Sequence, residues 1–239
     1  MSIEFAISDF AYAHRGLWAP DGLPENSLAA YIAAADQGFG IELDIRLTED
    51  GVPVCFHDDD LSRMTGSGGN LSETSLTDLT RLKLNNGQEG IPTFEGLLEV
   101  WPVNLPMLIE LKATEETAAK MTQAVADRLK GFHGTFAIMS FCEEAVLNVP
   151  NHVVRGYLIE PVMMLGDEVF QSKVDQGRTK LGADYYSIWH TDAENLLATG
   201  AANINEFAVW TIKSAEDYKT TLPFTKAQIF EGFDPKDIV

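Results

Sequence analysis

The sequence is short of cysteine, of long apolar runs and of any basic N-terminal segment. Its two cysteines, Cys55 and Cys142, lie in apolar strand-like stretches, so we expect reduced core residues and not a disulfide framework. No run of about 18 apolar residues occurs, which excludes a membrane-spanning helix. The first ten residues have neither a basic region nor a long apolar run, so the sequence predicts no signal peptide and a cytoplasmic protein.

The chain also has few basic residues. It has 17 Lys and Arg against 36 Asp and Glu, which gives a formal net charge of -19 over 239 residues. A chain this acidic repels nucleic acid and anionic lipid surfaces, so we expect no nucleic-acid partner and no stable membrane association. An anionic substrate would need a local cationic patch or a metal ion.

Internal repeats, low-complexity tracts and interdomain linkers are absent too, which indicates a single domain over residues 1–239. Short β-branched or aromatic runs alternate instead with helical patterns. The expected strands are 11–14, 40–48, 107–111, 135–141, 153–159, 184–189, 207–212 and 227–230; the expected helices are 26–37, 94–101, 115–130, 143–148, 167–180, 193–199 and 215–221. Eight such strands in this length predict the α/β class and a TIM (β/α)8 barrel, with a doubly wound open sheet as the alternative.

Residues 60–91 interrupt this alternation. The stretch is polar and rich in glycine and asparagine, with one weak helical pattern at 76–83. It follows the second strand and a return arm at 53–57. We therefore expect a small insertion that lies over the strand ends.

Residues 40–58 are the stretch around which the expected site is organised. Apolar and polar residues alternate strictly in its first half, which places Glu42 and Asp44 on one face of a strand. Asp50-Gly51 predicts a two-residue type I′ turn, in which both central residues have positive φ. With that turn, Asp44 lies directly opposite His57, and a carboxylate meets an imidazole.

Polar side chains collect at the ends of the expected strands, where a TIM barrel holds its active site. The strand 107–111 adds Glu110 to Glu42 and Asp44. Three carboxylates with few nitrogen competitors suit a hard divalent cation, Mg²⁺ or Ca²⁺, and not zinc. A salt bridge is the alternative for each acid taken alone, but the three together favour a metal site.

Two cations and two histidines accompany these acids. Arg15 and Lys112 suit a phosphate beside the metal, the first as a planar fork and the second as a point charge. The alternative is that both only balance the carboxylates. His14 and His57 suit general acid and general base, because the unperturbed pKa of histidine allows either role near neutral pH.

The order of these residues along the chain is similar to that of a known family. The motifs are His14-Arg15-Gly16, Pro24-Glu25-Asn26-Ser27, Glu42-Leu43-Asp44, His57-Asp58, Glu110-Leu111-Lys112, Ser140-Phe141 and Val209-Trp210-Thr211. Together they resemble the glycerophosphodiester phosphodiesterase family, a TIM-barrel family with a small insertion after its catalytic hairpin. The resemblance implies Glu42, Asp44 and Glu110 as metal ligands, His14 and His57 as the acid-base pair, Arg15 and Lys112 on the phosphate, and Phe141 and Trp210 as pocket walls.

Some features leave alternatives open. Phe141 and Trp210 could equally be core aromatics, and Glu25 could either brace Arg15 or only begin a helix. The family usually ends its last strand with Ile-Thr-Asp, where this chain has Ile229-Phe230-Glu231, and usually has asparagine at the position of Lys213. We expect neither departure to touch a catalytic residue, and both to lie near the alcohol end of a substrate.

The sequence therefore predicts a metal-dependent phosphodiesterase that hydrolyses glycerophosphodiesters to an alcohol and glycerol 3-phosphate, with His57 as the acid and His14 as the base. One alternative is a lysophospholipase D-like or sphingomyelinase D-like enzyme of the same superfamily, which the negative charge disfavours. Another is a non-catalytic module that binds phosphodiesters, which the intact pair of histidines disfavours. The alcohol, the metal and the oligomeric state stay open.

Overall fold

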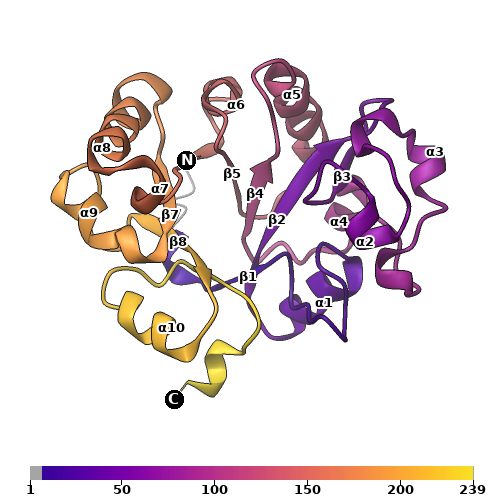
Figure 1. The fold of residues 1–239 in the computed structure, drawn as a ribbon, viewed down its shortest axis with the longest axis horizontal. Helices are drawn as coiled ribbons and strands as arrows, with labels where there is room; N and C mark the ends of the chain where they lie inside the picture. Colours follow the sequence, from indigo (N-terminus) through magenta and orange to yellow (C-terminus); the bar gives the residue numbers. More distant parts are fainter. Residues whose placement is uncertain (1–6, 239) are drawn as a thin grey trace.

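Parallel strands close into a barrel in the computed structural model, which describes residues 7–238 (Figure 1). The barrel strands are β1 (Tyr12–His14), β2 (Gly40–Leu47), β4 (Met107–Leu111), β5 (Phe136–Ser140), β6 (Val154–Leu158), β7 (Tyr185–Trp189), β8 (Phe207–Ile212) and β9 (Gln228–Phe230). Because β1 pairs with both β2 and β9, the sheet has no open edge between its first and last strands. The predicted TIM barrel is confirmed and the open doubly wound sheet is excluded.

Helices connect the strands and surround them (Figure 1). They are α1 (Leu28–Asp36), α4 (Phe94–Val100), α5 (Ala118–Leu129), α6 (Glu143–Asn148), α7 (Val162–Leu165), α8 (Asp167–Gln176), α9 (Ala193–Ala198) and α10 (Ala215–Thr221), with shorter turns η1 (Ile7–Asp9), η4 (Gly177–Leu181), η5 (His190–Asp192) and η6 (Pro235–Asp237). Ser27 caps α1 by accepting a hydrogen bond from the Ala30 backbone N–H at 3.1 Å. Among the described residues, no helix is long and apolar enough to cross a bilayer. Most of the N-terminal stretch in which no signal peptide is predicted lies outside the described residues.

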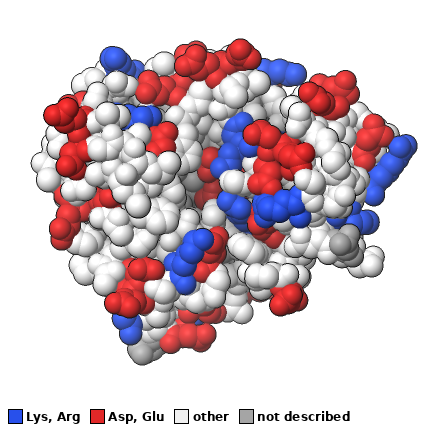
Figure 2. Space-filling model, in the orientation of Figure 1, with Lys and Arg blue, Asp and Glu red and all other residues white. Residues whose placement is uncertain are grey.

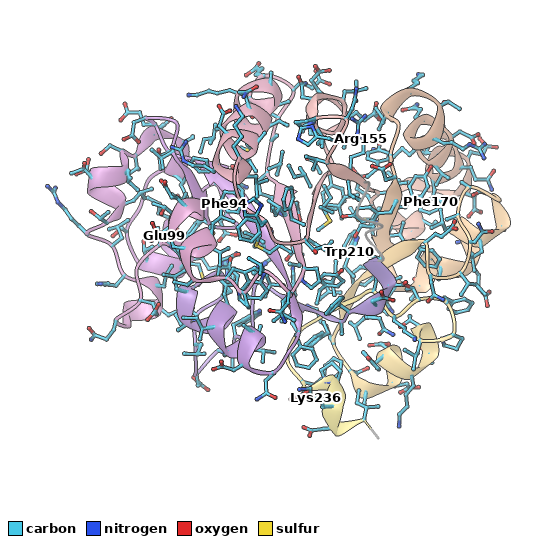
Figure 3. The ribbon with its side chains drawn as sticks, turned by 180° about the vertical axis from the view of Figure 1, so that it is seen from behind. Phe94, Glu99, Arg155, Phe170, Trp210 and Lys236 are labelled. Atoms are coloured by element: carbon cyan, nitrogen blue, oxygen red, sulfur yellow. The ribbon has the colours of Figure 1, made fainter. Side chains whose placement is uncertain are left out.

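Alternation along the strands divides the core into two parts. Residues such as Ile41 and Leu43 point outward, and they pack with the surrounding helices in the larger hydrophobic cluster. Figure 3 labels Phe94 on α4 and Phe170 on α8, both buried in that layer. The barrel interior holds a smaller apolar cluster, and polar residues occupy the inward positions at the carboxyl ends of the strands. The barrel is thus filled at one end and polar at the other.

The insertion has a small core of its own, which its polar composition did not indicate. Residues 60–91 form α2 (Ser62–Thr65), η2 (Leu71–Glu73), α3 (Leu76–Leu79) and η3 (Leu84–Asn86) at the edge of the barrel (Figure 1). Leu71, Leu79 and Leu84 are buried against Val54 and Phe56 of the hairpin arm. The predicted helix 76–83 ends at Leu79. The insertion therefore packs directly behind the segment that carries His57.

The predicted register of the hairpin is wrong by one residue. β3 (Pro53–Cys55) pairs antiparallel with β2 so that Ile45 lies opposite Cys55, and the Phe56 backbone N–H donates to the Asp44 carbonyl at 3.0 Å. Asp44 therefore faces Phe56 and not His57. The loop has three residues between Thr48 and Val52, and of these Gly51 alone has a positive φ, of 79°. A type I′ turn needs two such residues, and the Thr48 hydroxyl, which accepts from the Val52 N–H at 2.9 Å, stabilises the longer loop.

Candidate active site

Neighbouring parallel strands bring the predicted acids together at the carboxyl end of the barrel. His14 on β1 is in register with Glu42 on β2, and Asp44 is in register with Glu110 on β4. One carboxylate oxygen from each of Glu42, Asp44 and Glu110 lies within 4.8 Å of the others, and all three side chains are buried. The structure thus places the three predicted metal ligands in one cluster.

The three carboxylates differ in how well they are compensated. Asp44 Oδ1 lies 3.0 Å from Lys112 Nζ and Asp44 Oδ2 lies 3.0 Å from Arg15 Nε. Burial alone would raise the pKa of Asp44, but Lys112 and Arg15 outweigh it and hold that pKa well below its usual range. Glu110 lies 2.5 Å from Lys112 Nζ.

Glu42 is the least compensated of the three. Only 2% of it is exposed, neither carboxylate oxygen has a hydrogen-bond partner, and the ring of His14 lies 3.7 Å away. Burial, together with the negative charges of Asp44 and Glu110, raises the pKa of Glu42 well above its usual range. Buried oxygens without a partner are costly unless a cation satisfies them. The donor set, which is all carboxylate oxygen, fits a hard divalent cation such as Mg²⁺ or Ca²⁺.

A tight turn after β1 aims Arg15 back at this cluster. Arg15 and Gly16 both have positive φ, 59° and 84°, and a Cβ on Gly16 would come within 2.7 Å of the Ala30 backbone. Asn26, also at positive φ, donates from Nδ2 to Asp44 Oδ2 at 2.9 Å. Glycine after Arg15 and asparagine at the start of α1 are thus required by the backbone that builds the site.

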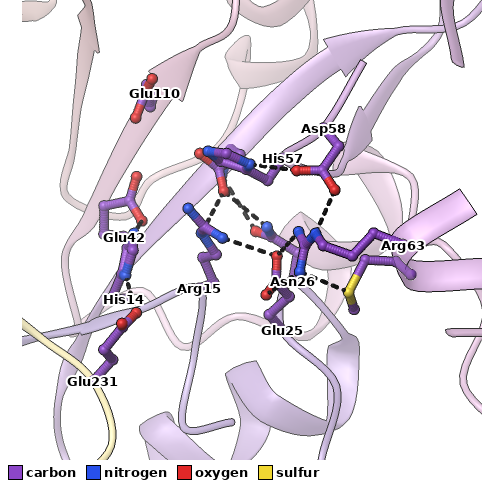
Figure 4. Close-up of polar contacts among 12 residues, drawn as sticks. His14, Arg15, Glu25, Asn26, Glu42, His57, Asp58, Arg63, Glu110 and Glu231 are labelled. Carbon is purple, nitrogen blue, oxygen red and sulfur yellow. Dashed lines mark hydrogen bonds and ion pairs between the residues drawn. The ribbon is translucent and has the colours of Figure 1, made fainter. Parts of the chain in front are cut away.

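A salt-bridge network holds Arg15 in place. Its Nη1 donates to Glu25 Oε1 at 2.9 Å, and the same carboxylate accepts two bonds from Arg63 on α2, at 2.7 and 3.0 Å (Figure 4). Arg63 and Arg15 lower the pKa of Glu25 against the effect of its burial. Of the two roles open for Glu25, the structure shows the bracing of Arg15. The network also ties the insertion to the barrel.

Both predicted histidines are held by a carboxylate on Nδ1 (Figure 4). His57 Nδ1 lies 2.7 Å from Asp58 Oδ1, and Asp58 in turn pairs with Arg63 Nε at 2.5 Å. His14 Nδ1 lies 2.5 Å from Glu231 Oε2. An anionic carboxylate on Nδ1 fixes the ring tautomer, so Nε2 is the nitrogen left for proton transfer. Burial lowers the pKa of His57.

Glu231, and Lys213 through its contact with Glu231, lie closer to His14 than the sequence predicts. Glu231 Oε1 pairs with Lys213 Nζ at 2.7 Å while Oε2 contacts His14. These two partners outweigh burial and lower the pKa of Glu231 to about 2. The expectation that neither departure touches a predicted catalytic residue is therefore wrong for Glu231, which contacts His14, whereas Lys213 contacts Glu231. The sequence does indicate a site position for Glu231, because Glu231 directly follows β9 just as Lys112 directly follows β4.

One cavity of about 150 Å³ is lined by two of the acids, Glu42 and Glu110, together with both cations and both histidines. Phe141 and Trp210 lie in its opposite wall with their rings edge to face, 5.6 Å between centroids, and Trp189 packs on Trp210 at 5.3 Å. Figure 2 shows charged side chains crowded around the central hollow on the side of α2 and α3, whereas the surface over α7 is largely uncharged. The cavity thus has one ionic wall and one aromatic wall.

Comparisons with known proteins agree with this geometry. The family model described as "Glycerophosphoryl diester phosphodiesterase family" matches residues 14–146, more than half of the chain. Glycerophosphodiester phosphodiesterase 1 of Mus musculus is 32% identical over 146 residues, which is 57% of this chain and 44% of that protein. The matched part thus spans less than half the length of that relative.

Two solved structures share the fold over nearly their full length. A phosphodiesterase from Oleispira antarctica, solved in complex with the product sn-glycerol-3-phosphate, superposes with a TM-score of 0.80 at 25% identity, over 98% of this chain and 97% of that one. A glycerophosphodiester phosphodiesterase from Thermotoga maritima has a TM-score of 0.73 at 24% identity, over 92% and 93% of the two chains. From the family match and the residues that carry it, the chain belongs to the glycerophosphoryl diester phosphodiesterase family.

Proposed function

We propose that this protein is a metal-dependent hydrolase of glycerophosphodiesters that releases glycerol 3-phosphate and an alcohol. The observation that carries the proposal is the cluster of Glu42, Asp44 and Glu110 between two histidines that each have a carboxylate on Nδ1. Family membership and the product bound to the Oleispira antarctica phosphodiesterase support the substrate class. The cavity of about 150 Å³ suits a small diester.

Glu42, Asp44 and Glu110 would hold the metal. The buried, unpartnered oxygens of Glu42 are the part of the cluster that most needs a cation. Mg²⁺ or Ca²⁺ bound there would supply electrostatic stabilisation to the non-bridging oxygens of the phosphate as charge develops on them.

The chain's own residues bind and orient the diester. Arg15 and Lys112 both line the cavity, and both stay protonated because nearby carboxylates raise their pKa despite burial. They present positive charge to the phosphate, the guanidinium as a planar fork and the ammonium as a point charge. His14 and His57 divide the proton transfers between them, one taking the proton of the attacking water and the other giving a proton to the leaving alcohol. Phe141 and Trp210 exclude water from the opposite wall.

A second candidate, a phospholipase of lysophospholipase D type, has one observation in its favour. Met163 and Met164 on α7 are 85% and 73% exposed, an unusual exposure for two adjacent apolar residues. The largely uncharged surface over α7 in Figure 2 could meet a hydrocarbon chain. Activity on lysophospholipids that exceeds activity on glycerophosphodiesters would favour this second function.

The test is a substrate panel with variants of the acidic cluster. Wild-type protein is assayed on glycerophosphoethanolamine, -choline, -glycerol and -inositol and on lysophospholipids, each with Mg²⁺, with Ca²⁺ and with chelator. We expect metal-dependent release of glycerol 3-phosphate, and loss of that activity in Glu42→Ala and Glu110→Ala. Both variants should also lose the increase in Tm that the metal gives to the wild type.

Glu99→Ala is the matched control, because Glu99 is an exposed acid on α4 that does not line the cavity (Figure 3). It should keep both activity and the metal-dependent Tm. Full activity in chelator, or wild-type activity in both Glu42→Ala and Glu110→Ala, would reject the proposal.

A further inference from the structure

A second cavity opens beside the catalytic one, and neither the family match nor the proposed chemistry assigns it a role. It has a volume of about 550 Å³ and lies between the β1–α1 loop and the residues that follow β8 and β9. We call it the outer groove, and define it by Trp18, Lys213, Phe230, Glu231, Phe233 and Asp234. All of these segments follow the carboxyl ends of their strands, so the outer groove opens on the same face of the barrel as the catalytic cavity.

The outer groove adjoins the catalytic cavity at His14, which lines the cavity and contacts Glu231 of the groove. Glu231 lines the groove and contacts His14 Nδ1, and Gly16 at the groove wall directly follows Arg15. In Figure 4, Glu231 lies on the side of His14 that is away from Glu110. A substituent that leaves the phosphate on the His14 side would therefore enter the outer groove.

The walls of the outer groove are mainly apolar and aromatic. Trp18 and Phe233 are half-buried, so part of each ring faces the groove, while Phe230 is buried behind them. Phe233 is braced from two sides, by Phe230 at 5.8 Å and by Tyr218 at 6.2 Å between ring centroids. The ring of Phe233 is therefore fixed by packing before any ligand enters.

The charges of the outer groove do not cancel. Lys213 is neutralised by its ion pair with Glu231 at 2.7 Å. Asp234 has no ion-pair partner within the described part of the chain; its Oδ1 accepts only the Lys236 backbone N–H, at 2.9 Å. The overall formal charge of -19 has the same sign. The unmatched charge is negative, and it favours a cationic ligand over a neutral or anionic one.

We propose that the outer groove binds the trimethylammonium end of a choline phosphodiester. A quaternary ammonium has no N–H to donate, so it is recognised by aromatic rings and by unpaired negative charge and not by directed hydrogen bonds. Trp18, Phe233 and Asp234 supply that combination. The proposal rests on the proposed phosphodiesterase function and adds to it the class of alcohol.

The position of the groove also assigns the two proton transfers. With choline in the outer groove, the choline oxygen lies on the His14 side of the phosphate. As water attacks, His57 takes its proton and the new phosphorus–oxygen bond forms. The bond from phosphorus to the choline oxygen then breaks, and His14 gives its proton to that oxygen. This assignment is the reverse of the one expected from the sequence.

The first experiment measures binding without catalysis. Choline and its neutral isostere 3,3-dimethylbutan-1-ol are titrated by calorimetry against wild-type protein, Asp234→Asn and Asp237→Asn. Asparagine can still cap the Lys236 N–H, and Asp237 is an exposed carboxylate outside the groove, so it is the matched charge control. We expect choline to bind about 3- to 10-fold more tightly than the isostere in the wild type and in Asp237→Asn, and equally in Asp234→Asn.

The second experiment compares substrates. The ratio of kcat/KM for glycerophosphocholine to that for glycerophosphoglycerol should fall about 3- to 10-fold in Asp234→Asn and stay unchanged in Asp237→Asn. Trp18→Leu, which keeps apolar area but removes the ring, should lower the same ratio.

The two proposals fail in different ways. Equal binding of choline and its isostere to the wild type overturns the choline assignment, and tighter binding of the isostere replaces it with a hydrocarbon site. If no glycerophosphodiester is hydrolysed with either metal while choline still binds, the phosphodiesterase function is overturned and the cation site stands.

Discussion

The two histidines of the site have the same kind of support, but it comes from different parts of the molecule. His57 is held by Asp58, its neighbour in sequence, and Arg63 from the insertion completes the network. His14 is held by Glu231, 217 positions away, and by Lys213 behind it. The first support needs only the hairpin and its insertion. The second exists only once β9 closes the barrel against β1.

The surroundings of the two histidines differ as well. The His57 side is ionic, because Arg63 joins Asp58 to the Glu25–Arg15 pair. The His14 side opens into an apolar groove of about 550 Å³. An organic substituent has room to leave on the His14 side and is met by charged groups on the other. This asymmetry is the reason for proposing different roles for the two histidines.

The largest expected effect distinguishes the two histidines by using two substrates, one whose leaving group needs a proton and one whose leaving group does not. His14→Ala and His57→Ala should each slow hydrolysis of glycerophosphocholine by about 10²- to 10⁴-fold. A 4-nitrophenyl diester of glycerol phosphate loses a weakly basic phenolate that needs no proton, so with this substrate His14→Ala should lose less than about 10-fold. His57→Ala should be slow with both substrates. The measurement is kcat for the two substrates.

His152→Ala is the control for these variants, because His152 is exposed and lies outside the cavity. It should retain wild-type kcat on both diesters. If the nitrophenyl substrate restores activity to His57→Ala and not to His14→Ala, then His57 is the acid and the assignment from the groove is wrong.

A smaller effect is expected from the carboxylates behind the histidines. Glu231→Gln and Asp58→Asn should each lower kcat by about 10- to 100-fold, because a neutral amide no longer stabilises the protonated ring. In Glu231→Gln, KM should change little, since Glu231 does not reach the phosphate. Glu231→Asp should recover less activity than its charge suggests, because the shorter side chain must span the 2.5 Å contact to His14 and the 2.7 Å contact to Lys213 together.

Asp58→Asn and Glu231→Gln should differ in their effect on KM. Arg63 binds both Asp58 and Glu25, so Asp58→Asn should also weaken the bracing of Arg15 and raise KM modestly. Glu231→Gln should leave KM unchanged. Equal kcat in wild type and Glu231→Gln would mean that Glu231 does not position His14.

Much of the fold follows from local pattern alone. The strands Met107–Leu111 and Phe207–Ile212 and the helices Glu143–Asn148 and Ala215–Thr221 are predicted with the bounds that the structure has. Their apolar period is clear and their ends are marked by breakers or caps. The acids of the site are predictable for a related reason, since they occupy inward positions at the ends of parallel strands.

Features that depend on tertiary contacts could not be read in this way. The hairpin register depends on a hydrogen bond to the Thr48 hydroxyl, which lengthens the loop by one residue. The core of the insertion depends on leucines that share no helical or strand period, such as Leu61, Leu71 and Leu84. The contact between His14 and Glu231 depends on barrel closure. Glu231 directly follows the last strand, so the expectation that polar residues at strand ends face the active site also indicates Glu231.

The smallest expected effect concerns stability against pH on the two sides of the site. The pKa of Glu231 in the folded protein is about 2, below its ordinary value of 4.5, and the pKa of Asp58 is lowered too. A depressed pKa means that the ionised carboxylate stabilises the fold. The stabilisation is complete above about pH 4.5 and is lost as the pH falls through the folded-state value.

Glu231→Gln should therefore lower the free energy of unfolding near pH 7 by at most about 3 kcal/mol, and the variant should lose less stability than the wild type between about pH 4.5 and 2. Asp58→Asn should do the same to a smaller extent, because Asp58 is the more exposed of the two, with 23% of its side chain accessible against 13% for Glu231. Urea unfolding of the metal-free protein across this pH range measures both. A larger effect from Asp58 than from Glu231 would contradict the view that the long-range support, and not the local one, contributes more to holding the barrel closed.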